Sequence, residues 1–355
     1  MPHAVFLRKG TKGFWLHKVW MAGVRLALWL LCLGAAAHSG ELFSENELNA
    51  RQTEVLARFR SYAPEGAAGG TWMLGVWDSD DGFDELVVMP SGTGNAAANF
   101  VKLEELYRLE EARVQRGDPD VDGVRELLAA AEAAHCRLAP DYYPPFTTVN
   151  DKQPDFMILR YYLGSLLKHA ERLEAVGDRL GAERAYQAAL ICGRHLTNDR
   201  YSAIVYITGM IFKLRGAQEY ERFLRRIGNP VKAEAAKGYA ARMMVLLKFS
   251  VWKTNEALSD MDDFACLPTT ILVATGDSEV CWRKEAVVRL AMIRHGVPDK
   301  ELKTLTRNPK WERLAEKALS LVVATDQDAS VRALAAWAAL NVRPENYESM
   351  THVFP

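Results

Sequence analysis

Apolar residues recur three or four positions apart along most of this chain, and this spacing constrains the fold more than any other feature of the sequence. The clearest case runs from Phe156 to Leu173, where the apolar residues fall on one face of a predicted helix. A helix with one apolar face is stable only when another element covers that face. Several such segments follow one another, separated by joints that contain glycine, aspartate, asparagine or proline, so the sequence predicts an all-α body of packed helices.

The predicted helices are joined into hairpins. They are expected over residues 41–62, 95–116, 120–137, 156–176, 202–215, 218–227 and 232–258, with one more beginning after Asp178. Gly117, Asp118 and Pro119 form the joint of one pair, because glycine and proline end helices. Residues 269–275 are apolar and β-branched, and their periodicity leaves open whether they form a short strand or a turn of a buried helix.

One pair of segments has a β pattern. Trp72–Trp77 and Phe83–Met89 are rich in aromatic and β-branched residues, and they flank the turn-forming run Asp78–Gly82. Strand-like runs separated by a short polar loop are typical of a β-hairpin. One small β-hairpin is therefore expected near the N-terminus of the helical body.

The first 40 residues have the layout of an export signal. They hold five basic residues and no acidic one, with an apolar run, Leu26–Ala37, that ends in small alanines. This run is too short to cross a bilayer about 30 Å thick by itself, so cleavage after Ala37 is the preferred interpretation. An uncleaved leader would instead anchor the chain through residues 14–37, with its basic flank inside. In both cases the rest of the chain is expected outside the cytoplasm, periplasmic, secreted or tethered to the membrane.

The charge balance excludes one class of partner. The chain has 44 Lys and Arg against 45 Asp and Glu, and without the five basic residues of the leader 39 face 45. Nucleic-acid binding requires a basic face that neutralises phosphates. The sequence supplies no such cluster, so no nucleic-acid partner is expected.

Four cysteines follow the leader: Cys136, Cys192, Cys266 and Cys281. In an oxidising compartment they permit two disulfides in any of three pairings, and the alternative is that they are buried thiols. Two cysteine–histidine pairs suggest another use, namely His135 with Cys136, and Cys192 with His195 at helical i, i+3 spacing. A metal site would require these four residues to converge. Nothing else in the sequence supports convergence, so no metal and no cofactor is predicted.

One helical hairpin resembles a tetratricopeptide repeat. The residues at that family's signature spacing are Leu166, Ala170 and Leu173 in the first helix, and Gly177, Ala182, Tyr186, Ala189 and Leu190 in the second. The likeness covers about one repeat. Arg194 stands where the family usually has a proline, and no second copy of equal quality is found. The resemblance implies a helix pair that packs closely across its small residues.

The C-terminal part resembles HEAT repeats. A pattern of acid, hydrophobe followed by arginine, and alanine occurs twice, 49 residues apart: Glu279, Trp282, Arg283 and Ala286, then Asp328, Val331, Arg332, Ala335, Ala339 and Leu340. In such repeats the arginine and the acid commonly tie neighbouring units together. The resemblance therefore implies a structural role for both.

Catalytic motifs are sparse. The sequence contains no G-x-S-x-G, no G-x-x-x-x-G-K-[ST], no H-E-x-x-H and no C-x-x-C. The segment 138–155 contains four prolines and three aromatic residues, and it either drapes over helix ends or forms a recognition surface. In the second case a binding platform would comprise five rings: Trp72, Trp77, Tyr142, Tyr143 and Phe146.

Four regions are expected: residues 1–37 as signal peptide or anchor, 38–94 as an N-terminal helix with the β-hairpin, 95–260 as TPR-like hairpins and 261–355 as HEAT-like helices. Because stacked hairpins expose extended curved surfaces, the predicted function is a non-enzymatic scaffold or adaptor that binds another protein outside the cytoplasm. The alternatives are an extracytoplasmic enzyme or a ligand-binding protein, with a site where the β-hairpin meets the proline-rich segment. The whole chain also resembles exported helical proteins of environmental bacteria, and that resemblance implies no activity.

Overall fold

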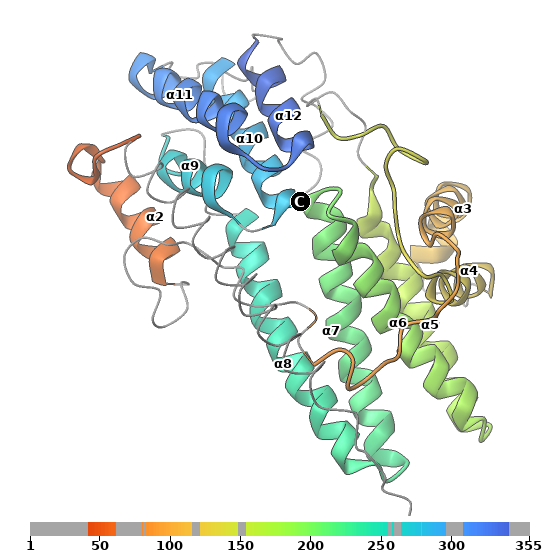
Figure 1. Ribbon diagram of the computed structural model, residues 1–355. Coiled ribbons are helices and arrows are strands. Elements are labelled where there is room, and N and C mark those ends of the chain that lie inside the picture. The colour runs from red at the N-terminus through yellow and green to blue at the C-terminus, as the bar shows by residue number, and fades with distance from the viewer. Residues whose placement is uncertain are drawn as a thin grey trace, which may run out of the picture.

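The computed structural model describes residues 42–61, 80, 82–115, 121–147, 154–254, 258, 264–277, 279–295 and 308–340. In these ranges the chain is helical and has no β-strand, which confirms the all-α class (Figure 1). The longer helices are α2 (Ala50–Ser61), α3 (Ala97–Gln115), α4 (Val121–Ala131), α5 (Leu159–Ala175), α6 (Arg179–Asp199), α7 (Ala203–Arg226), α8 (Pro230–Trp252), α9 (Leu267–Gly276), α10 (Val280–His295), α11 (Pro309–Thr325) and α12 (Ala329–Ala339). Two short 3-10 helices, η1 (Glu45–Glu47) and η3 (Phe156–Ile158), precede α2 and α5.

Most helices pack against their neighbours in sequence. Helices α5, α6, α7 and α8 form a row of long antiparallel helices, and α9, α10, α11 and α12 gather at one end of this row (Figure 1). Helices α3 and α4 lie beside α5 and α6, and α2 packs against α9. The body is therefore a succession of helical hairpins.

Two hairpin joints use the same local chemistry. In the α5–α6 joint Gly177 has φ +84°, and Asp178 caps α6 by accepting a hydrogen bond from the backbone N–H three residues on, at 2.9 Å. In the α7–α8 joint Gly228 has φ +79°, and Asn229 caps α8 in the same way at 3.2 Å. Glycine adopts this left-handed conformation without strain, so both helices end where the sequence predicts a break.

The α7–α8 hairpin repeats the α5–α6 hairpin 51 residues later. In both hairpins three alanines of the second helix are buried, and side chains this small let neighbouring helices approach closely. The corresponding positions are Leu173 and Leu224, Gly177 and Gly228, Ala182 and Ala233, Ala185 and Ala236, and Ala189 and Ala240. The sequence interpretation missed this internal repeat, because the second copy has Lys237 where the first has Tyr186.

Other predicted boundaries differ from the structure. The expected break between residues 215 and 218 is absent, because Gly216 faces Ala189 of α6 at close range and packs there instead of ending α7. Residues 269–275 belong to helix α9 and not to a strand.

Helices α6 and α7 approach each other through two glycines. A Cβ atom at Gly193 would lie 2.8 Å from the carbonyl oxygen of Gly209, and a Cβ atom at Gly209 would lie 2.7 Å from that of Gly193. Backbone contacts this short leave no room for a side chain. The two glycines therefore set the separation of α6 and α7.

The predicted β-hairpin is not confirmed. Residues 83–86 form turns and residues 87–89 have no regular secondary structure, and Trp72–Trp77 lies outside the described residues. The region is fixed to α6 and α7 through Asp80. Its carboxylate accepts a hydrogen bond from the fully buried ammonium of Lys213 at 2.5 Å and pairs with Arg194 at 3.1 Å.

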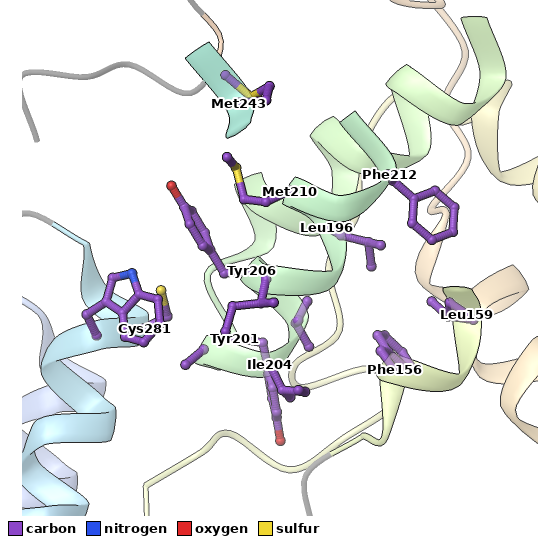
Figure 2. Close-up of a cluster of buried hydrophobic side chains, with 14 of the residues drawn as sticks. Phe156, Leu159, Leu196, Tyr201, Ile204, Tyr206, Met210, Phe212, Met243 and Cys281 are labelled. Atoms are coloured by element: carbon purple, nitrogen blue, oxygen red, sulfur yellow. The ribbon is translucent and has the colours of Figure 1, made fainter. Parts of the chain in front are cut away.

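One apolar core runs from the row α5–α8 into the group α9–α12. In Figure 2, residues at the start of α7, among them Tyr206, lie between Phe156 and Leu159 on one side and Cys281 of α10 on the other. Tyr206 also meets Trp282 edge to face, with ring centroids 6.3 Å apart. The two groups of helices therefore share a core.

The predicted leader, residues 1–37, lies outside the described ranges. None of the described helices combines the length and the apolar character needed to span a bilayer.

Candidate functional site

The segment 132–147 covers the C-terminal turn of α6. Asn95 anchors this segment: its side-chain oxygen accepts from the Arg137 backbone N–H and its side-chain nitrogen donates to the Arg137 carbonyl, both at 2.9 Å. The same oxygen accepts from the N–H of Ala97 at 3.1 Å, at the start of α3. Because Asn95 binds this stretch of backbone, the helix predicted to continue to Arg137 stops at Ala131.

The segment buries two of its three aromatic rings. Tyr143 is 9% exposed and Phe146 is 2% exposed, whereas Tyr142 is 42% exposed. Tyr143 donates a hydrogen bond to the buried carboxylate of Glu104, and burial together with this bond raises the pKa of the Tyr143 phenol. Phe146 stacks on Tyr201, with ring centroids 6.3 Å apart. The segment thus packs over helix ends and contributes two of its three rings to the core.

The expected platform of five rings is corrected accordingly. Tyr143 and Phe146 are buried and cannot contribute to an exposed surface. Tyr142 is the one ring of the described three that faces solvent, while Trp72 and Trp77 lie outside the described residues.

Where the segment meets α6 and α10, it forms with them a group of ionisable side chains that we call the junction cluster: His135, Cys136, His195, Asp199 and Lys284. Asp199 is the last residue of α6, and one of its carboxylate oxygens accepts from the Leu138 N–H at 2.9 Å. His195, one turn earlier, is 3% exposed and hydrogen-bonds to the backbone of Ala133. In the described part of the chain, the second Asp199 oxygen and His195 Nε2 are buried without a hydrogen-bond partner.

Burial shifts the pKa values of His195 and Asp199 in opposite directions, so the pKa of the acid ends above that of the base. It raises the pKa of Asp199 to about 6 and lowers the pKa of His195 to about 4, because a buried site disfavours both charged forms. Between these two values both side chains are uncharged. Burial also lowers the pKa of Lys284 and raises that of Cys136. Shifted pKa values gathered in one place are found both at functional sites and in buried structural clusters.

The four predicted disulfide candidates are free thiols in the structure. Cys192, Cys266 and Cys281 are buried and Cys136 is half-buried. Cys192 donates to the Leu127 carbonyl at 3.3 Å, and burial raises its pKa. The fold brings Cys136 near enough to Cys192 to interact electrostatically, but no disulfide links them. Thiols with a raised pKa are poor nucleophiles.

The four residues of the possible metal site do approach one another. His135 interacts electrostatically with His195, and Cys136 with Cys192. Within the described ranges, however, no three His, Cys, Asp or Glu side chains are arranged to hold a metal ion. Among the described residues these four side chains therefore lie near one another without the arrangement of metal ligands.

Sequence reasoning missed Asp199 and Lys284. Asp199 follows His195 by four residues on the same face of one helix, a spacing that the sequence displays. Lys284 comes from α10, and only the tertiary fold brings it near Asp199. Comparison of the chain with protein-family models, with curated proteins and with solved structures finds no match.

Proposed function

We propose that this chain is an exported helical-repeat protein that binds another protein outside the cytoplasm, as a scaffold or adaptor. The observation that carries the proposal is the succession of hairpins α5–α6, α7–α8, α9–α10 and α11–α12 on one apolar core. Proteins built from stacked hairpins bind macromolecules through their extended surfaces. The likeness to TPR and HEAT repeats and the leader-like residues 1–37 support the same function by analogy.

The test starts from expression of the chain with its own leader. Cell fractionation and mass analysis of the N-terminus give its location and processing, and chemical cross-linking in the intact cell before affinity purification gives its partner. We expect an N-terminus near His38, or a membrane-anchored chain with its body outside. We also expect one protein that is cross-linked reproducibly. A chain that stays in the cytoplasm, or one that cross-links to no other protein, would contradict the proposal.

The junction cluster favours a second candidate, an extracytoplasmic ligand-binding protein or enzyme. His195 Nε2 and an oxygen of Asp199 lie buried one helical turn apart on α6 without hydrogen-bond partners among the described residues. Two groups of this kind can bind a polar ligand. A thermal-shift screen of small polar compounds tests this. A true ligand would raise the melting temperature of the native chain and would lose that effect in His195→Gln and Asp199→Asn.

A further inference from the structure

Lys284, in α10, is a buried lysine without a carboxylate in contact. The residue is 5% exposed, and within the described ranges its side-chain nitrogen forms no hydrogen bond and no ion pair. The two other buried lysines of the described chain each bind an aspartate: Lys213 binds Asp80, and Lys253 binds Asp277 at the α9–α10 joint, both at 2.5 Å. Because an unpaired buried charge is costly, the surroundings of Lys284 favour its neutral form.

Two acids lie near this amine without reaching it. Asp328, at the start of α12, and Asp199, at the end of α6, interact with Lys284 electrostatically, and neither forms a salt bridge with it in the part of the chain that the structure describes. The carboxylate of Asp328 caps its own helix by accepting from two backbone N–H groups. The second oxygen of Asp199 has no such partner there. Asp199 is therefore the nearby acid with an oxygen left to exchange a proton.

An aromatic ring completes the surroundings of the amine. Lys284 Nζ lies over the ring of Phe146, 5.8 Å from its centroid, and Phe146 stacks on Tyr201. The nitrogen is not sealed from solvent, unlike His195 Nε2 and the second oxygen of Asp199. Solvent therefore touches the amine beside an aromatic ring.

Burial gives the two groups the protonation states that a condensation needs. It lowers the pKa of Lys284, against the opposing effect of the nearby carboxylates, and it raises the pKa of Asp199 to about 6. A neutral lysine amine is a nucleophile toward carbonyl carbon, whereas the protonated ammonium is not. A carboxylic acid near it can protonate the oxygen that leaves as water. The pair thus suits the condensation of an amine with an aldehyde.

We propose that Lys284 binds a small aromatic aldehyde covalently, as an imine. Nζ attacks the carbonyl carbon and passes a proton to its oxygen, which gives a carbinolamine. Asp199 then protonates the hydroxyl group, the C–O bond breaks and water leaves, and the nitrogen returns a proton to Asp199 as the C=N bond forms. The aldehyde and the amine thus give an imine and water, with no oxidant or reductant. The inference rests on the second candidate function, ligand binding at the junction cluster, and is independent of the scaffold function.

Reductive trapping tests the imine with the full chain. The folded protein is incubated near neutral pH with a low concentration of benzaldehyde and with sodium cyanoborohydride, which reduces an imine to a stable benzylamine, and the labelled lysines are mapped by mass spectrometry. An ordinary exposed lysine is almost fully protonated at this pH and reacts slowly. We therefore expect Lys284 to be labelled at least about tenfold faster than Lys317, an exposed lysine of α11 in the same chain.

Three variants identify the groups that react. Lys284→Arg keeps a positive charge but forms no imine, so the intact chain should lose most of its label. Asp199→Asn removes the proton source and should slow labelling of Lys284 at least about fivefold. Asp84→Asn removes an exposed carboxylate and should leave the rate unchanged. Circular dichroism shows whether each variant is folded, and the comparison of Lys284 with Lys317 needs the native chain alone.

The outcomes for the imine and for ligand binding are separate. Labelling of Lys284 no faster than that of Lys317, or only after unfolding in urea, would overturn the proposal, as would an unchanged rate in Asp199→Asn. A compound that raises the melting temperature of the native chain but leaves no label would contradict the imine and retain ligand binding at the cluster. If neither effect is found, both proposals fail.

Discussion

The guanidinium of Arg283 contacts two joints at once. It donates to the Asp277 carbonyl at the joint before its own helix and to both carboxylate oxygens of Asp326 at the next joint. One side chain therefore fixes the spacing of two successive hairpins. The acid that Arg283 binds is Asp326, and not Glu279 or Asp328, which the HEAT-like pattern contains.

The glycines between α6 and α7 should be irreplaceable. Gly193→Ala places a methyl group 2.8 Å from the Gly209 carbonyl, so the helices must separate, and we expect the free energy of unfolding to fall by about 2–3 kcal/mol. Gly164→Ala in α5 is the matched control, because a Cβ there meets nothing within 4 Å. That variant should gain about 0.5–1 kcal/mol from the better helix propensity of alanine. Urea unfolding measures both. Equal effects of the two substitutions would show that α6 and α7 do not touch there.

Asp199 should make the fold less stable at neutral pH than under mildly acidic conditions. Its pKa is raised from 3.8 to about 6, so the folded chain binds this proton more tightly than the unfolded chain. The contribution of Asp199 to stability therefore grows as pH falls from about 7 toward 4. Asp199→Asn keeps an acceptor for the Leu138 N–H and should raise the free energy of unfolding at pH 7.5 by up to about 3 kcal/mol. Urea unfolding at several pH values tests this, and a variant less stable than the native chain at pH 7.5 would refute it.

His195 should have the opposite effect. Its pKa is lowered from 6.5 to about 4, so the folded chain favours the neutral ring. Its contribution to stability is complete above pH 6.5 and is lost as pH falls toward 4. We expect the ring to titrate near 4 by NMR, with its signals assigned through their loss in His195→Gln. A midpoint above 6 would mean that the ring is hydrated.

The buried pair of Lys213 and Asp80 should be sensitive to loss of one partner. The Lys213 side chain is fully buried, so Asp80→Asn removes the carboxylate of a buried ion pair and should cost about 3–5 kcal/mol. Asp84→Asn is the matched control. Asp84 pairs with Arg194 from an 83% exposed side chain and should cost less than about 0.5 kcal/mol. Thermal unfolding compares them, and equal losses would exclude a special role for Asp80.

The sequence predicted the helical class and several joints because these depend on local chemistry. Apolar spacing shows a helix face, and Gly177 and Gly228 end helices through their own backbone conformation. The α5–α6 break was therefore placed correctly. The continuation of α7 through Gly216 could not be predicted, because that glycine packs against a residue of another helix.

The candidate site was less predictable for the same reason. The spacing of Cys192 and His195 was visible, but burial of His195 and Asp199 depends on the segment 132–147, and Asn95 holds that segment from a distant part of the chain. Whether each aromatic ring of the segment is buried or exposed also depends on the tertiary fold. No pattern within the segment distinguishes the buried Tyr143 from the exposed Tyr142 beside it.

A double-mutant cycle on Arg283 and Asp326 tests most directly whether buried ion pairs tie successive hairpins into one array. Arg283→Gln and Asp326→Asn should each lower the free energy of unfolding by about 3 kcal/mol, because each removes one member of a mostly buried ion pair. The double variant should lose less than the sum, with a coupling energy of at least about 1.5 kcal/mol. The exposed pair of Arg222 and Glu219 on α7 gives the reference value, expected below about 0.5 kcal/mol. A coupling energy for Arg283 and Asp326 no larger than this reference would contradict the account.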